Sequence, residues 1–266
     1  MRPHLATFVL AAVACSGAAP DIKTPAQLRI AAAQQVLVAN PRSAPAYLEL
    51  ATGYVRLARE NDDVRLLDQA DQTLLKSPQD LSGNYDAQKL RVAIALGRHD
   101  YAGALTLATA LNRRAPDDIP VWGFLVQANM ALGNYSEAEK QAQWMLDLLP
   151  GNGPGLGQAA ELREVYGDLE GAIEFSTEAY RRVSENDSEE RASLLTENAH
   201  RQLIAGNLAG ARENLDRALK LLPEYPPALL NLARLRTAER NYPEAADLLA
   251  RRNQHMQSTG SLYGWA

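Results

Sequence analysis

The sequence contains little or none of several residue types on which particular folds depend. It has one cysteine, Cys15, which excludes an internal disulfide bond and a zinc site built from several cysteines. Aromatic residues make up only 6% of the chain, whereas alanine and leucine are plentiful, and this favours helices over sheets. The 27 basic residues are scattered among 32 acidic ones without a basic cluster, so a nucleic-acid partner is not expected.

Motifs that support catalysis or metal binding are also missing. No Gly-x-Ser-x-Gly sequence marks a hydrolase serine, and no histidine has a metal-ligand partner at helical or loop spacing. The glycine-rich stretch 151–157 lacks the lysine and hydroxyl residue of a phosphate-binding loop, so we interpret it as a turn. The acidic stretch 184–190 lacks the spacing of an EF-hand, and we interpret it as a lengthened, solvated connection. We expect no enzyme activity, no cofactor and no metal site.

The segment 1–20 has the character of an export signal. Arg2 precedes an apolar run from Leu5 to Ala14, and ten helical residues span about 15 Å, half of a bilayer core of about 30 Å. The run is too short for a transmembrane helix and suits a secretory signal. It ends in small residues before Cys15 and resembles a bacterial lipoprotein signal, although Ala12 stands where leucine is usual. Three interpretations stay open: lipidation of Cys15, ordinary cleavage with Cys15 incidental, and no export.

Six alanines share one register along the rest of the chain. The interval from each to the next is constant, except for one longer interval that contains the acidic stretch 184–190. The six are Ala70, Ala104, Ala138, Ala172, Ala211 and Ala245. A tyrosine or leucine stands three residues before each alanine, and we expect it to fill the wider end of a close helix contact. Such agreement at a fixed period indicates six copies of one supersecondary unit.

Each copy is predicted to be a pair of helices. An alanine at the shared position lets the two helices approach closely, because only a methyl group stands between their backbones. Gly133, Gly167 and Gly206 allow the left-handed conformation that often ends a first helix. Pro150 and Pro223 lack an amide hydrogen and cannot continue a second helix. No pair buries its apolar face alone, so the copies are expected to stack into a superhelix.

This pattern resembles the tetratricopeptide repeat family, whose period is about 34 residues. The third copy carries the signature most fully, at Trp122, Leu125, Val126, Gly133, Tyr135, Ala138, Ala142 and Pro150. The resemblance covers about residues 41–252 and implies an all-α fold, a right-handed α-solenoid of about six stacked helical hairpins. Before it, residues 21–40 are expected to hold a tether and a capping helix over 25–39, with Thr24 as N-cap. Residues 253–266 are expected to form a C-terminal tail.

In this family the first helix of each repeat lines a concave groove that binds a segment of another protein. The inward positions that the resemblance implies here are Gly123, Gln127, Met130, Gly157, Glu161, Glu164, His200, Leu203, Arg234 and Thr237. Gly123 and Gly157 occupy equivalent positions in the third and fourth copies, either by drift or to leave a dent for a partner side chain. Trp144, beside the buried register, either covers a neighbouring repeat or anchors a partner.

These expectations together favour a non-catalytic scaffold of the bacterial cell envelope that holds other proteins in its groove. It would be attached to the membrane in the periplasm or at the outer membrane if Cys15 is acylated. The alternative is a soluble periplasmic or secreted regulatory subunit of an enzyme or of a polysaccharide-synthesis complex. Palmitate labelling that requires Cys15 distinguishes the two hypotheses.

Overall fold

The computed structural model describes residues 24–255, and this part of the chain consists of helices joined by short turns, with no strand. The helices are α1 (Pro25–Ala39), α2 (Ala44–Asn61), α3 (Arg65–Lys76), α4 (Tyr85–Gly97), α5 (Tyr101–Arg114), α6 (Ile119–Ala131), α7 (Tyr135–Leu148), α8 (Gly153–Val165), α9 (Leu169–Arg182), α10 (Ser188–Ile204), α11 (Leu208–Leu221), α12 (Pro226–Ala238) and α13 (Tyr242–His255). The segment 1–20 with Cys15, and residues 256–266 of the tail, lie outside the described residues. Within them no helix combines the length and apolarity needed to cross a membrane.

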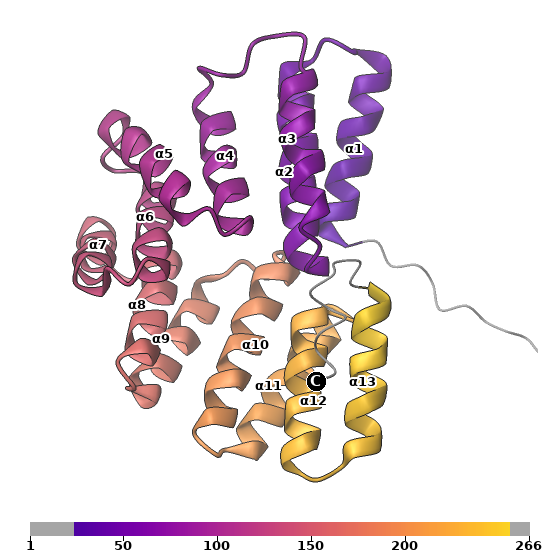
Figure 1. Cartoon of the computed structure of the whole chain (residues 1–266), viewed down its shortest axis with the longest axis vertical. Coiled ribbons are helices and arrows are strands. Elements are labelled where there is room, and N and C mark those ends of the chain that lie inside the picture. Colours follow the sequence, from indigo (N-terminus) through magenta and orange to yellow (C-terminus); the bar gives the residue numbers. More distant parts are fainter. Residues whose placement is uncertain (1–23, 256–266) are drawn as a thin grey trace, which may run out of the picture.

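From α2 onwards the helices pair into six hairpins, α2–α3, α4–α5, α6–α7, α8–α9, α10–α11 and α12–α13. Figure 1 shows these hairpins following one another in one superhelix, with α1 packed against α2 at its start. The expected all-α solenoid of about six hairpins is therefore confirmed. Because each hairpin packs against the next, the core is a row of apolar clusters rather than one centre.

Polar side chains at the helix starts explain where the elements begin. At α1, the Thr24 hydroxyl accepts a hydrogen bond from the Gln27 amide, and the Gln27 side chain accepts one from the Thr24 amide. This capping box satisfies two amides that the helix itself leaves without partners. Most other helices begin after an aspartate or asparagine whose side chain accepts from the third helical amide, as Asp118 does at α6 and Asn152 at α8.

The turn between the two helices of a hairpin keeps one backbone conformation in five repeats. Gly133, Gly167 and Gly206 have φ values of 79°, 81° and 77°, which confirms the predicted left-handed ends of the first helices. His99 and Arg240 stand at the equivalent positions and adopt φ values of 60° and 61°. The left-handed conformation costs a non-glycine residue about 1–2 kcal/mol. Hairpin packing is therefore strong enough to impose this turn without glycine.

The register alanines lie in the packed interior of the hairpins. All six are 0–5% exposed, as the predicted close contact between the helices requires. The expectation for the residue three positions earlier is wrong at Tyr135 and Tyr242, which are 40% and 61% exposed. These tyrosines are the first residues of α7 and α13. At a helix start beside the turn, the ring lies at the edge of the hairpin and not inside it.

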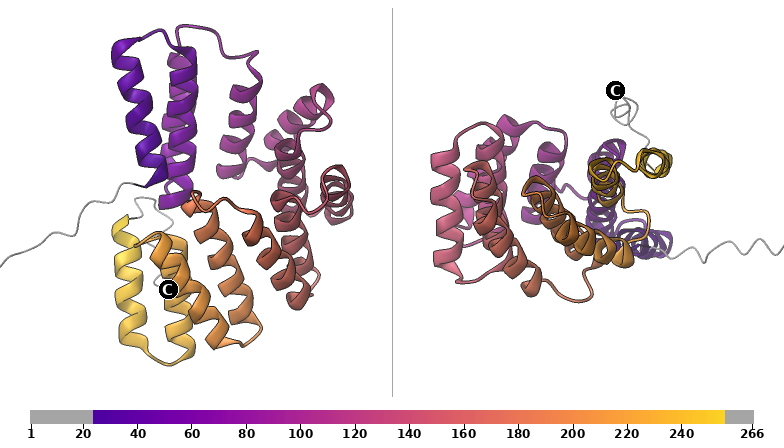
Figure 2. Two further views of the ribbon diagram at one scale, coloured as in Figure 1. Left: turned by 180° about the vertical axis from the view of Figure 1, so that it is seen from behind. Right: turned by 90° about the horizontal axis from the view of Figure 1, so that it is seen from below.

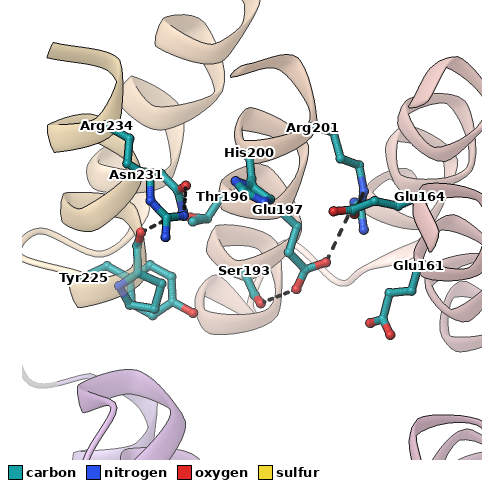
Figure 3. A pocket seen from close by; sticks show the side chains of 11 residues that line it. Glu161, Glu164, Ser193, Thr196, Glu197, His200, Arg201, Tyr225, Asn231 and Arg234 are labelled. Carbon is teal, nitrogen blue, oxygen red and sulfur yellow. Dashed lines mark hydrogen bonds and ion pairs between the residues drawn. The ribbon is translucent and has the colours of Figure 1, made fainter. Parts of the chain in front are cut away.

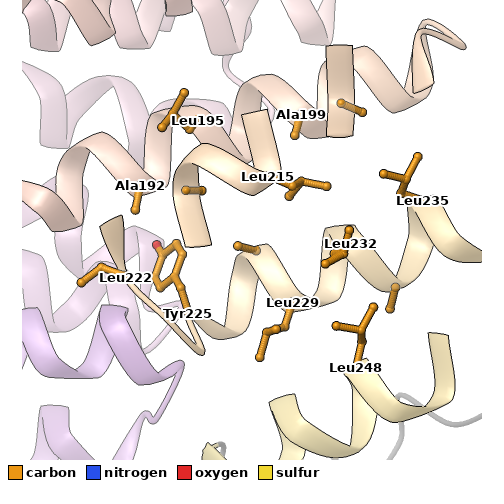
Figure 4. Close-up of a cluster of buried hydrophobic side chains, with 14 of the residues drawn as sticks. Ala192, Leu195, Ala199, Leu215, Leu222, Tyr225, Leu229, Leu232, Leu235 and Leu248 are labelled. Atoms are coloured by element: carbon orange, nitrogen blue, oxygen red, sulfur yellow. The ribbon is translucent and has the colours of Figure 1, made fainter. Parts of the chain in front are cut away.

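The largest apolar cluster joins the last two hairpins. Figure 4 shows side chains of α10, α11, α12 and α13 meeting between the helices, among them Leu215, Leu229 and Leu235, which are 0% exposed. In the third hairpin, by contrast, the Trp144 ring lies against Trp122 of the same hairpin, with ring centroids 6.1 Å apart. Trp144 remains 48% exposed.

The superhelix closes on itself through ion pairs between the first and fifth repeats. Arg56 of α2 lies 2.8 Å from Asp187, and Arg59 lies 2.6 Å from Glu189 and 3.1 Å from Glu190. The Glu189 side chain is only 1% exposed. The interpretation of 184–190 as a merely solvated connection is therefore wrong: its last residues begin α10 and pair with α2. We call these five residues the closure contact.

A second ion pair supports the same closure at the end of the chain. Arg252 of α13 lies 3.3 Å from Asp62, which follows α2. Figures 1 and 2 show α2 and α3 lying end to end with α10 and α13, so that the solenoid surrounds a central space. The first helices lining that space are thus part of a ring that has nearly closed, and not of an open crescent.

Successive first helices pack side by side, with one exception. Direct packing joins α2 to α4, α4 to α6, α6 to α8 and α10 to α12, whereas α8 and α10 approach each other much less. The longer connection between α9 and α10 coincides with this break in the stacking. On the inner surface, the gap between successive first helices is therefore widest between α8 and α10.

Candidate interaction site

Two adjoining cavities occupy the inner surface where α8 and α10 separate. One has a volume of about 470 Å³ and lies among α8, α10 and α12; the other, of about 700 Å³, reaches from α6 and α8 to α10 and to Arg59 of α2. They share Glu161, Ser193 and Glu197. We call the two together the central cavity. Each of the two volumes falls within the range of about 300–1,000 Å³ typical of ligand sites.

Helical spacing explains which side chains reach the central cavity. On α8, Gly157 and Glu161 are four residues apart, and Glu164 follows three residues later, so all three lie on one face. On α10, Ser193 and Glu197 are likewise four residues apart. Figure 3 shows the side chains of α8 and α10 pointing toward one another across the cavity.

One buried arginine bridges the two helices. The Arg201 side chain is 2% exposed, and its Nε donates to Glu164 Oε2 over 2.8 Å. Its Nη1 lies 4.0 Å from Glu197 Oε2, and Glu197 also accepts from the Ser193 hydroxyl over 3.0 Å. Burial raises the pKa of Glu197 above its usual range, and Arg201 opposes that rise. The ion pair of Arg201 with Glu164 ties α10 to α8, where direct packing between the two helices is weak.

Glu161 is the carboxylate that this network leaves out. It makes no hydrogen bond or ion pair with any described residue, and in Figure 3 its carboxylate lies free of the dashed interactions. Burial, together with the negative charges of Glu197 and Glu164, raises the pKa of Glu161 to about 8, and Arg201 opposes that rise. An acidic side chain is thus held in the cavity wall without a cation in contact to neutralise it.

The inward positions predicted from the sequence divide among three places. Gly123, Gln127, Gly157 and Glu161 line the larger cavity together, and Glu161, Glu164, His200 and Arg234 line the smaller one. Met130, Leu203 and Thr237 lie outside both linings: Met130 packs on the α6–α7 core, Leu203 packs on the α10–α13 core, and the Thr237 hydroxyl donates to the Ala233 carbonyl.

The two glycines of the predicted dent have different surroundings. A Cβ added at Gly157 would meet no atom within 4 Å, so the position faces open space. At Gly123 an added Cβ would lie 3.7 Å from Met145 Cε, which is ordinary van der Waals contact. A side chain at Gly157 would therefore extend into the cavity without disturbing the fold.

Within residues 24–255, no group of three histidine, cysteine or acidic side chains is placed to hold a metal ion. The cavity offers carboxylates, hydroxyls and amides on a rigid helical wall. Such a wall is suited to recognising a polar segment of another molecule.

Comparison with known families supports the repeat architecture from sequence. A family model described as tetratricopeptide repeat matches residues 95–143 and 202–263. The chain contains tetratricopeptide repeats in these two segments. Its repeats at these positions are the hairpins that the alanine register predicts.

Solved structures resemble the fold of this chain. One chain of the APC/C hetero-tetramer Cut9–Hcn1 is 18% identical, with a TM-score of 0.69 over 87% of this chain and 43% of that one. This chain therefore spans less than half of that relative. A tetratricopeptide repeat protein from Parabacteroides merdae is 16% identical, with a TM-score of 0.60 over 88% and 86% of the two chains. PilW, described as a type IV pilus biogenesis factor, is 14% identical, with a TM-score of 0.55 over 65% and 78%. No curated protein sequence matches the chain.

Sequence reasoning missed several residues of the site. Glu197 and Arg201 stand four residues apart on α10, a spacing that signals a helical ion pair, but the register pointed to His200 instead. The contact between Arg201 and Glu164 spans 37 residues. Arg59 reaches the cavity only through ring closure, 130 residues from Glu189. No local pattern carries these tertiary contacts.

Proposed function

We propose that this protein is a non-catalytic scaffold that holds a segment of a partner protein in its central cavity. The observation that carries this proposal is the cavity itself, which is lined by first helices of successive repeats and contains a carboxylate that no described residue contacts as a partner. Polar side chains fixed on a rigid scaffold lower the entropy that binding costs.

A crosslinking experiment tests this use of the inner surface. Gln127 is exposed and lines the cavity, so a photo-crosslinking amino acid placed there is expected to capture a protein in cells. Glu174, an exposed residue of the second helix α9, is the matched control position. Capture from position 174 but not from 127 would contradict a partner on the inner surface.

We further propose that the scaffold works in the bacterial cell envelope and is attached to a membrane through Cys15. The apolar run and small residues before Cys15 support this proposal. The fold-level likeness to PilW, a pilus biogenesis factor, is compatible with an envelope role.

Fractionation tests the membrane attachment. Cys15→Ser is expected to abolish palmitate labelling and to move the protein from the membrane to the soluble periplasmic fraction, because stable anchoring requires covalently attached acyl chains. An unmodified, soluble parent protein would instead favour the alternative, a soluble periplasmic regulatory subunit.

A further inference from the structure

The central cavity has more negative than positive charge around its unpaired member. Glu161, Glu164 and Glu197 converge from α8 and α10 on Arg201, and Arg59, Arg182 and Arg234 also line the cavity. Arg201 lies within hydrogen-bond distance of Glu164 only. Arg59 pairs with Glu189 and Glu190, and Arg182 pairs with Glu178, so Glu161 is the carboxyl that no cation contacts. Ionising this carboxyl without a partner is unfavourable, so a cationic ligand would stabilise its ionised form.

A second observation points to the same kind of ligand. Gln158 lines the larger cavity, is 7% exposed, and its side-chain oxygen has no hydrogen-bond partner among the described residues. A buried amide oxygen without a donor is uncommon in proteins and calls for one. The Gln158 side chain is uncharged, so its unpaired oxygen is an observation separate from the charges of the carboxylate cluster. A ligand that donates N–H groups would serve both features.

We propose that the central cavity binds an arginine side chain of the partner segment, with Glu161 and Glu197 as its carboxylate partners. This inference rests on the proposed function as a scaffold. A guanidinium group presents five donors in a planar fork, so it can serve carboxylates on two different helices and an amide oxygen at once. Arginine also stays protonated at every accessible pH, and its long apolar stem reaches past the rim of a cavity.

The open space beside Gly157 provides the route for such a side chain. No atom lies within 4 Å of a Cβ built there, and Gly157 lines the same cavity one helical turn before Glu161. A partner backbone that crosses α8 at Gly157 would place its side chain over Glu161. Gly157 then provides the entrance to the carboxylates.

Binding of an arginine side chain by Glu161 is coupled to the release of a proton. Because burial raises its pKa to about 8, the free protein at pH 7 holds most of Glu161 protonated, and an incoming guanidinium favours the ionised form. Arginine binding therefore releases a proton and strengthens as the pH rises from 6 to 9. Several charged or titratable groups face Glu161 or share its cavity. They are Arg59 on α2, Glu164 on α8, Arg182 on α9, Asp187 before α10, Glu190, Glu197, His200 and Arg201 on α10, Tyr225 before α12, and Arg234 on α12.

The test measures binding of two short probes to the full chain. The first is the acetylated, amidated peptide Gly-Gly-Arg-Gly-Gly, and the second replaces arginine by citrulline, which has nearly the same shape without the charge. By NMR titration at pH 8, the arginine peptide is expected to bind about tenfold or more tightly than the citrulline peptide, a difference of about 1.4 kcal/mol. Calorimetry in buffers of different ionisation enthalpy is expected to show the released proton.

Variants assign the effect to the cavity. Glu161→Gln keeps the side-chain shape and is expected to abolish both the preference for arginine and the proton release. Glu174→Gln on the exposed face of α9 is the matched control and should change neither. If Glu161→Gln does not fold by circular dichroism, Glu197→Gln replaces it, with the same loss of preference for arginine expected.

The outcomes separate this inference from the proposed function. Equal binding of the two peptides, no binding of either, or a preference for arginine that survives Glu161→Gln overturns the arginine site. Tighter binding of spermine than of the arginine peptide also overturns it, because the cavity would then take a polyamine. Crosslinking from position 127 is independent of these results. A captured partner combined with a failed peptide test leaves the scaffold and removes the arginine site.

Discussion

The closure contact predicts a measurable coupling between residues of the first and fifth repeats. Glu189 is 1% exposed, whereas Arg59 is 54% exposed, so their ion pair lies between the buried and the exposed case. Exposed pairs contribute about 0–1 kcal/mol, and breaking a fully buried pair costs about 3–5 kcal/mol. Because water screens the outer half of this pair, we expect a coupling energy of about 1–2 kcal/mol.

A double-mutant cycle measures this coupling. Arg59→Met keeps the apolar stem, Glu189→Gln keeps the shape, and urea unfolding of both single variants and the double variant isolates the interaction. The pair of Arg181 and Glu178, 3.0 Å apart within α9 and solvent-exposed at Arg181, is the matched control. Its coupling is expected to be about 0.3–0.5 kcal/mol, as for other helical pairs at this spacing.

The same contact governs the shape of the molecule. Replacing Arg56 and Arg59 together by methionine leaves Glu189 without its cations, and the radius of gyration in X-ray scattering is expected to increase as the ring opens. The parent protein should open partly in 1 M salt, where the Debye length falls to about 3 Å. A cycle coupling no larger than the control, with an unchanged radius in the methionine variant, would refute the argument that these ion pairs close the superhelix.

Three further changes have defined outcomes. Ala138→Leu should lower the free energy of unfolding by about 1–3 kcal/mol through overpacking, because Ala138 is 0% exposed; an unchanged urea midpoint would argue against the alanine register. Gly157→Leu should leave helix content intact by circular dichroism and weaken partner binding by about tenfold, and full affinity would remove the dent from the mechanism. Burial raises the pKa of Glu161 from 4.5 to about 8 in the folded protein. The free energy of unfolding of the parent should therefore fall, relative to that of Glu161→Gln, as the pH rises from about 5 to above 8. Parallel profiles of stability against pH for the two proteins would contradict the raised pKa of Glu161.

The hairpins could be predicted because their signals are local. An alanine such as Ala138 and a glycine such as Gly133 act within one hairpin, where helix contact and turn conformation depend on residues close in the chain. The period and register of the alanines therefore located the repeats in the sequence, although they say nothing of how the repeats are arranged in space. The exposed Tyr135 shows the limit of this reasoning, since a repeated position identifies a shared environment but not whether that environment is buried.

Tertiary structure alone determined how the repeats curve and what their inner face contains. Small rotations between neighbouring hairpins add up along the chain, and the weak packing between α8 and α10 changes the total rotation. This total rotation brings Arg59 to Glu189 and leaves Glu161 unpaired beside Arg201. The sequence by itself determined the repeating unit because helix formation and hairpin packing are short-range. The closed ring and its acidic cavity arise from contacts between different repeats, far apart in the chain, which no local pattern specifies.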